Sequence, residues 1–144
     1  MLNAKAVRMA RKVTIDNLGS EIKKILEQYS DDLQGNLDIV TKKVGQKGAQ
    51  LLRNESKSAF PDGKGTYASG WTATVEKTRV YTVVTIHNKK QAGLAHLLEF
   101  GHVSANGTGR NFQTDKAPVK GKEHIGPVEK ELVLQYESEV RSII

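Results

Sequence analysis

Cysteine is absent from this chain of 144 residues, which excludes a disulfide framework and any metal site that depends on thiolate ligands. Aromatic residues make up only 6% of the sequence, so few large side chains are there to anchor a core. No apolar run approaches the roughly 18 residues that a membrane span needs, and the N-terminus lacks the apolar core of a signal peptide. These absences predict an intracellular protein without thiol redox chemistry and without a membrane anchor.

Length and composition fit one globular domain, with 38% hydrophobic and 26% charged residues. The net charge of +6 is unevenly distributed: residues 1–14 carry four basic side chains and no acid, whereas acids predominate between Asp16 and Asp38. We therefore expect a flexible basic leader over residues 1–14 and a single α+β domain over residues 15–144. Such a leader can contact phosphates or an acidic neighbour.

Apolar residues recur at steps of three and four from Ile15 to Val44, which predicts a long amphipathic N-terminal helix. Thr14 or Asp16 is suited to cap its first turn. A glycine in a helix interior costs about 1 kcal/mol relative to alanine, so Gly35 leaves two options, a continuous helix or a break near that residue. In either case we expect helical structure to about residue 56, before Pro61 ends it.

Two segments rich in β-branched residues, 71–75 and 80–88, predict a small antiparallel sheet with a turn between them. Apolar residues occupy both faces of the second segment, with Val84 and Ile86 on one and Val83 on the other. We therefore expect both faces to be covered, one by a helix and the other by a neighbouring subunit.

Downstream of the sheet, residues 94–100 predict a short central helix, with Gly101 as its left-handed stop. Residues 103–123 are rich in glycine and charge and predict a long loop or an extended hairpin, a length usual only for functional or disordered loops. Gly126-Pro127 then favours the start of a C-terminal helix, which we expect to pack on the sheet.

The central helix also carries the residues closest to a chemical site. His96, Glu99, His102 and His124 suggest a metal-dependent hydrolase, because imidazole and carboxylate are common zinc ligands. His96 and Glu99 can share a helix face, but Gly101 ends the helix before His102, and the spacing matches no zinc signature. We expect no bound metal.

The alternative interpretation of this run is structural. Leu97, Leu98 and Phe100 then enter the core, while the flanking histidines bond to the backbone or to Glu99. No serine lies in a nucleophile elbow and no phosphate-binding loop is present, so we expect no catalytic residue and no cofactor. A small basic nucleic-acid-binding protein stays open as another reading, although the positive charge lacks interleaved aromatics and predicts weak or no nucleic-acid contact.

Three short motifs, taken in order, resemble those of a known family. They are the Tyr67–Trp71 segment (Tyr-Ala-Ser-Gly-Trp), the run Ala95–His102, and the segment His124–Pro127 (His-Ile-Gly-Pro). The chain resembles the phage tail-component family typified by the gene-product-10 protein of bacteriophage HK97. The positions that carry this signature are Tyr67, Trp71, His96, Leu97, Leu98, Glu99, Phe100, Gly101, His102, His124, Ile125 and Pro127.

The resemblance implies a non-enzymatic structural protein of a tailed bacteriophage or prophage. It implies a tail-completion or tail-terminator-type role at the head–tail junction, with signature residues in the core or at an interface. The implied assembly is a homo-oligomer, a hexameric ring that contacts the tail tube protein and the head–tail connector. Such a protein would assemble in the host cytoplasm and then reside in the virion.

Overall fold

The computed structural model describes residues 14–102 and 118–144. It contains a long helix, a two-stranded antiparallel sheet, a short helix and a C-terminal helix, so the predicted α+β class is confirmed. The chain divides into two compact units, residues 1–35 and 36–144. The flexible leader and most of the long loop fall on residues 1–13 and 103–117, outside the described residues, and stay predictions.

The described part of the first unit is helical. A 3-10 turn, η1 (Ile15–Asn17), leads into helix α1 (Leu18–Ala59). Thr14 is the N-cap of η1, and its backbone N–H donates to Asn17 Oδ1 at 2.8 Å. The apolar side chains of α1 in this unit are all about half exposed or more; they are Leu18, Ile22, Ile25, Leu26 and Tyr29.

Helix α1 continues through Gly35 without interruption, so a break there does not occur. No atom of another element lies within 4 Å of the position that a Cβ would take at Gly35, and the helix simply tolerates the weak helix propensity of glycine. The boundary between the two units nevertheless falls at this residue. The helix ends at Ala59, slightly later than expected and just before Pro61.

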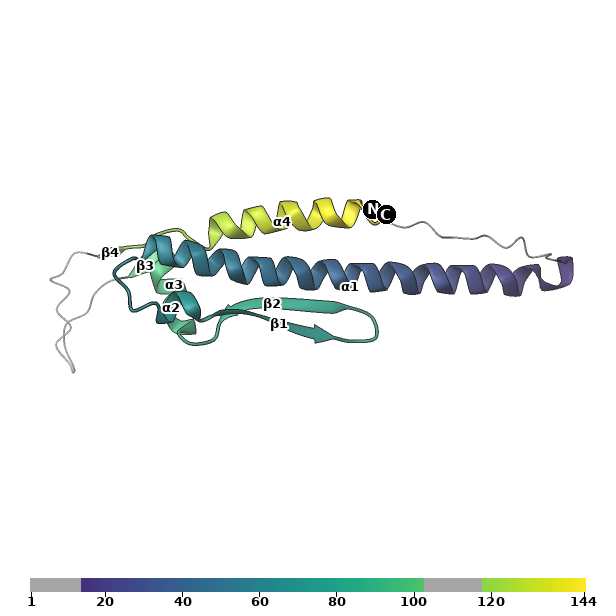
Figure 1. The fold of residues 1–144 in the computed structure, drawn as a ribbon, viewed down its shortest axis with the longest axis horizontal. Coiled ribbons are helices and arrows are strands. Elements are labelled where there is room, and N and C mark those ends of the chain that lie inside the picture. Colours follow the sequence, from purple (N-terminus) through teal and green to yellow (C-terminus); the bar gives the residue numbers. More distant parts are fainter. Residues whose placement is uncertain (1–13, 103–117) are drawn as a thin grey trace. The chain divides into compact units, whose positions relative to one another are not determined.

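The second unit contains the sheet and the remaining helices (Figure 1). The sheet pairs β1 (Trp71–Lys77) with β2 (Thr82–Asn88), in register from Trp71↔Asn88 to Lys77↔Thr82. Strand β1 extends two residues further at its turn end than predicted. A one-turn helix before β1 was not expected. The elements are α2 (Thr66–Ser69), β1 (Trp71–Lys77), β2 (Thr82–Asn88), α3 (Ala92–Phe100), β3 (Gly101–His102), β4 (Val119–Lys120) and α4 (Gly126–Arg141).

One face of the β1–β2 hairpin packs on α1 because two helix glycines leave room for it. The Val84 side chain occupies the space where a Cβ of Gly45 would lie, and Ile86 does the same at Gly48. The opposite face is exposed, including Val83 at 42%. The predicted cover of one face by a helix is therefore confirmed. No element of the described chain lies against the second face, which is mostly polar, and its cover by a neighbouring subunit stays a prediction.

A buried carboxylate ties the far end of the hairpin to α1. Asp38 is only 6% exposed; it accepts a hydrogen bond from the Thr82 hydroxyl at 2.6 Å and pairs with Lys77 Nζ at 2.6 Å. Because a buried carboxylate without such partners would be strongly disfavoured, these contacts fix the position of the hairpin end along the helix.

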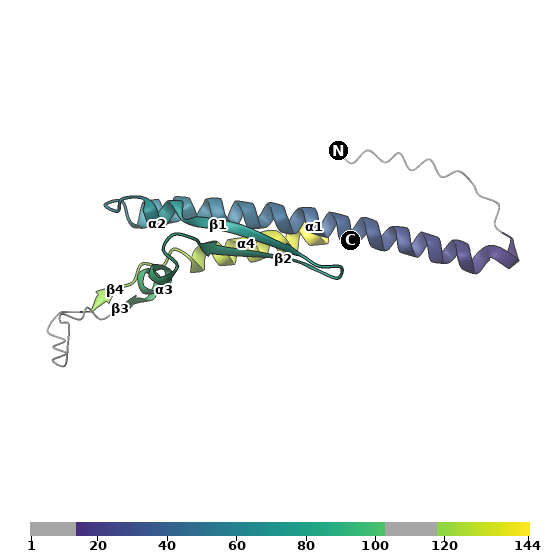
Figure 2. The same ribbon diagram turned by 90° about the horizontal axis from the view of Figure 1, so that it is seen from below.

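Helix α4 runs alongside α1 in both views (Figures 1 and 2). Lys43 Nζ lies 2.9 Å from Glu139 Oε2, and the Thr41 and Tyr136 hydroxyls are 3.2 Å apart. The helix reaches the sheet where Leu132 meets Ile86 over Gly48. The C-terminal helix thus packs mainly on α1 and only partly on the sheet, which refines the predicted arrangement.

The core lies at the C-terminal end of α1, where Leu52, Tyr67, Trp71 and Val128 are buried together. Part-buried side chains from α3 and α4 surround them. Within the described residues, no helix combines the length and the apolar character that crossing a membrane requires.

Candidate functional site

Four aromatic rings meet in this core, and each comes from a different part of the chain. Phe60 follows α1, Tyr67 lies in α2, Trp71 opens β1 and His124 precedes α4. The His124 ring is edge-on to Phe60 and Tyr67, with centroids 5.2 and 5.6 Å away, and Tyr67 is 5.7 Å from Trp71. Edge-to-face pairs at such separations are favourable. This aromatic cluster therefore holds together elements that are distant in sequence.

Hydrogen bonds fix the orientation of the rings. The Tyr67 hydroxyl lies 2.7 Å from His124 Nε2, and His124 Nδ1 lies 2.7 Å from the Lys122 carbonyl oxygen. A carbonyl only accepts, so Nδ1 carries a proton; when the ring is neutral, Nε2 accepts the tyrosine hydroxyl. The indole N–H of Trp71 donates to Ser56 Oγ at 2.8 Å. Buried polar atoms bonded in this way specify one arrangement of the core.

Glu99 connects α3 to the aromatic cluster and to α4. Its Oε2 accepts the backbone N–H groups of His124 at 2.8 Å and of Ile125 at 2.9 Å, and its Oε1 accepts that of Gly126 at 2.9 Å. The first N–H groups of a helix lack partners inside the helix, and its N-terminus favours negative charge. Glu99 is thus a cap for α4, supplied by another helix.

The electrostatics of this cap follow from its contacts. Burial raises the pKa of the Glu99 carboxyl, but three backbone N–H donors and the adjacent His124 ring lower it, and the net pKa lies below its ordinary value. His124 Nδ1 is 3.0 Å from Glu99 Oε2. Burial, together with the charge of Glu99, raises the pKa of Tyr67 to about 12. Tyr67 is therefore a neutral hydroxyl at physiological pH.

Further hydrogen bonds support the cluster from residues that sequence reasoning missed. Arg53 Nε donates to the Trp71 carbonyl at 2.9 Å. The Asn88 side-chain amide donates to the Tyr67 carbonyl at 2.8 Å, and its oxygen accepts the backbone N–H of Gln91 at 2.9 Å. The position of Asn88 between a strand and a turn is typical of a turn-forming asparagine, whereas Ser56 gave no signal within its helix.

The apolar residues of α3 do not all enter the core. Leu98 is part-buried and packs against the core, but Leu97 is 37% and Phe100 73% exposed. Placing Leu97 and Phe100 in the core was therefore wrong. Successive helix residues are about 100° apart, so the face that presents Ala95 and Leu98 to the core turns Leu97 and Phe100 away from it.

The histidines of the run also differ from expectation. His96 is exposed and lies beside Phe100, with ring centroids 4.9 Å apart and ring planes tilted by 52°. His102 Nδ1 is buried and has no hydrogen-bond partner within the part of the chain that the structure describes. The histidine that meets Glu99 is thus His124, which lies beyond the run, because Glu99 points toward the start of α4.

Gly101 ends α3, as predicted, with a positive φ of 84°. Its ψ of 173° is extended rather than left-handed helical, so the chain passes directly into β3, which pairs with β4 across the ends of the long loop. A Cβ at Gly101 would overlap the Val119 carbonyl oxygen. Of the remaining signature residues, Ile125 packs on the core and Pro127 lies in the first turn of α4.

Tyr67, His124 and Glu99 form a chain of polar contacts that could in principle relay protons. However, Tyr67 is 9%, His124 1% and Glu99 7% exposed, and three backbone N–H groups already occupy the carboxylate. Tyr67 borders a pocket, but its hydroxyl lies 2.7 Å from His124 Nε2, and the side chains of His124 and Glu99 are buried. The geometry therefore supports a structural role, in which these contacts hold α2, α3 and the start of α4 together.

The four residues considered as ligands of a metal-dependent hydrolase, His96, Glu99, His102 and His124, do not come together in the structure. Glu99 and His124 are in contact, whereas His96 is exposed beside Phe100 and His102 is separately buried. Across residues 14–102 and 118–144, no three side chains of the ligand-forming types gather in a way that could hold a metal ion.

Comparison with known proteins agrees with this structural reading. No curated protein and no solved structure shows significant similarity to the chain. One family model, described as "Bacteriophage HK97-gp10, putative tail-component", matches residues 20–101. The match covers more than half of the chain, from the exposed part of α1 through Tyr67 and Trp71 to Glu99 and Gly101. The chain belongs to the HK97-gp10-like family of phage tail components.

Proposed function

We propose that this protein acts at the head–tail junction of the virion, as a tail-completion or head–tail joining component that assembles into a ring. A phage tail component is a structural protein of the virion, and family membership supports that much directly. The finer role rests on the surface of the molecule. The ring is proposed to be a hexamer that contacts the tail tube protein and the head–tail connector.

The observation that carries the proposal is the exposed apolar stripe of α1. Leu18, Ile22, Ile25, Leu26 and Tyr29 follow one another on the helix with exposed fractions between 47% and 64%. Contiguous apolar surface of this kind marks an interaction site rather than ordinary protein surface. A protein that works by joining other subunits needs such a surface, whereas the buried Tyr67–His124–Glu99 contacts only maintain the fold.

Gene disruption tests the role directly. Phage lacking this protein should accumulate separate heads and tails, or tails of uncontrolled length, visible by negative-stain electron microscopy. Supplying the protein from a plasmid should restore joined particles. A plasmid that supplies the Glu123→Gln variant should restore them as well, because that side chain is exposed. Normal infectious particles from the disrupted phage would rule the proposal out.

A further inference from the structure

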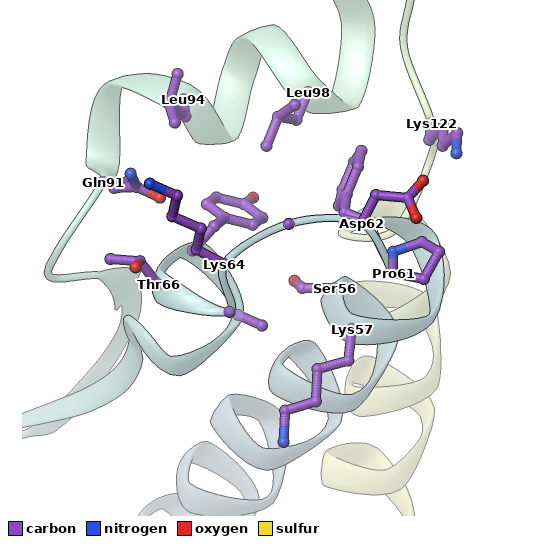
Figure 3. A pocket seen from close by; sticks show the side chains of 15 residues that line it. Ser56, Lys57, Pro61, Asp62, Lys64, Thr66, Gln91, Leu94, Leu98 and Lys122 are labelled. Carbon is purple, nitrogen blue, oxygen red and sulfur yellow. The ribbon is translucent and has the colours of Figure 1, made fainter.

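A second surface feature lies in the other unit. A pocket of about 560 Å³ opens between the end of α1, the turn that follows it and helix α3 (Figure 3). Leu94 and Leu98 of α3 border it on one side, and Ser56 and Pro61 lie on the other. Its lining is mainly apolar, and its volume is within the range of pockets that hold ligands or anchoring side chains.

The rim of this pocket is positively charged. Lys57, Lys64 and Lys122 line it, against a single carboxylate, Asp62. Lys122 Nζ donates to the Ala59 carbonyl at 2.9 Å and lies over the Phe60 ring. Lys57 and Lys64 are exposed and make no ion pair with any residue that the structure describes. The pocket thus fits an apolar group that carries negative charge beside it.

The exposed stripe of α1 is apolar and lies in a helix segment of net negative charge. Ile22, Ile25, Leu26 and Tyr29 are 48%, 64%, 62% and 59% exposed. They occupy positions i, i+3, i+4 and i+7, the spacing by which an amphipathic helix anchors itself in an apolar groove. These exposed side chains are available to a partner.

The charges of the two surfaces are opposite. Residues 14–35 carry five carboxylates and two lysines, a net charge of −3, in a chain whose total is +6. At about 100° per residue, Glu21 and Asp32 lie beside the stripe, whereas Asp16, Glu27 and Asp31 lie on the other side of the helix. A helix segment of net negative charge and a pocket bordered by lysines attract each other, which raises the rate of productive encounter, most strongly at low salt.

We propose that the stripe of one copy, centred on Ile22, Leu26 and Tyr29, docks into the Lys57–Lys64 pocket of a second copy. The apolar side chains enter the pocket and the acidic flanks face the lysines. Each copy presents both surfaces, and the two surfaces differ, so the contact is head to tail and can repeat until a ring closes. The inference builds on the proposed ring-forming role, for which it supplies the subunit contact.

Two variants disable one surface each. In the stripe variant, Ile22→Gln is combined with Leu26→Gln, which keeps good helix formers while removing the apolar anchors. In the pocket variant, Lys57→Glu is combined with Lys64→Glu. A control with the same change of charge combines Lys89→Glu with Lys130→Glu, two exposed lysines that do not line the pocket. Circular dichroism and Trp71 fluorescence should be unchanged in all three, because every altered side chain is exposed.

Sedimentation equilibrium then measures self-association of the full chain. The wild type and the control should associate, whereas each disabled variant should associate about thirtyfold more weakly or worse, as expected for loss of central anchors. Mixing the stripe variant with the pocket variant leaves one intact contact, so the mixture should form a complex of one chain of each and nothing larger.

Several outcomes would overturn the inference. They are a wild-type protein that stays monomeric, variants that associate as well as the control, and a mixture that remains two separate monomers. If each variant alone loses self-association and the two variants mixed together form no complex, the contact between subunits is symmetric instead of head to tail. These results leave the head–tail role standing, since that role fails only if disruption of the gene yields normal particles.

Discussion

The Glu99 cap allows the sharpest test of the fold. Replacement of Glu99 by glutamine preserves the shape of the side chain and removes its charge. One oxygen of the new amide can still accept the N–H groups of His124 and Ile125, as Oε2 does now. The amide nitrogen would then face the N–H of Gly126, which Oε1 accepts at 2.9 Å in the wild type, so that donor loses its partner.

The size of the effect follows from these contacts. A hydrogen bond to a charged group contributes roughly 1.5–3 kcal/mol, and a negative charge at a helix N-terminus adds about 0.3–1 kcal/mol. Because Glu99 is only 7% exposed, solvent does little to reduce either contribution. We expect the Glu99→Gln variant to lose about 2–4 kcal/mol of unfolding free energy at pH 7, a large part of what a typical domain has.

Urea unfolding provides the measurement. Trp71 is the only tryptophan of the chain and is 4% exposed, so its emission should shift when the core opens. The Glu123→Gln variant is the matched control: this exposed glutamate lies one residue before His124, and its change should stay within about 0.5 kcal/mol.

The dependence on pH adds an independent check. The pKa of Glu99 is lowered in the folded state, so the unfolded chain binds more protons and the stabilisation is present above the ordinary glutamate pKa. It is lost as the pH falls through the folded pKa. The difference between wild type and Glu99→Gln should therefore narrow below about pH 4.5. A difference under 0.5 kcal/mol at pH 7, or one that stays constant on acidification, would refute the role of Glu99 as cap.

Three further outcomes are expected. Gly101→Ala should lower the unfolding free energy by more than about 2 kcal/mol, because φ is positive and a Cβ would overlap the Val119 carbonyl. Gly93→Ala, at a helix position with open space around it, should not lower the unfolding free energy; urea unfolding of both variants tests this. Gly35→Ala should stabilise the chain by up to about 1 kcal/mol, measured as a rise in thermal midpoint, since the site is an open helix interior. Tyr67 should ionise near pH 12 in an ultraviolet titration, later than an exposed tyrosine, and a transition near pH 10 for all tyrosines would contradict its burial.

Much of the fold could be predicted because its signals are local. The heptad-like recurrence of apolar residues from Ile15 to Val44 predicted α1, and Pro127 predicted the start of α4. Gly101 predicted the end of α3 for a local reason as well, since few other residues tolerate its φ of 84°. The periodicity of apolar residues could not decide whether Gly35 breaks the helix. That outcome depends on whether the small cost of a glycine in a helix interior exceeds the stability of the helix on either side of it.

The candidate site was predicted less well because its contacts are not local. Glu99 and the N–H groups that it caps are separated by 25 to 27 positions, and no spacing rule links a glutamate in one helix to the start of another. The sequence drew attention to His96 and His102, next to Glu99, although His124 is its true neighbour. Likewise, the apolar character of Phe100 suggested burial, and only the orientation of α3 shows that its ring faces outward.

The buried aromatic cluster and the proposed docking pocket share side chains, so a change that destabilises the cluster should also weaken binding at the pocket. Phe60, Tyr67 and Leu98 line the pocket and also pack in or against the core. Glu99, next to Leu98, holds α3 to α4 and so sets the position of the α3 wall. Loosening the Glu99 cap should then weaken self-association even though the carboxylate never meets the partner. The stripe variant should do the reverse, abolishing association without loss of stability, because Ile22 and Leu26 support no part of the described core.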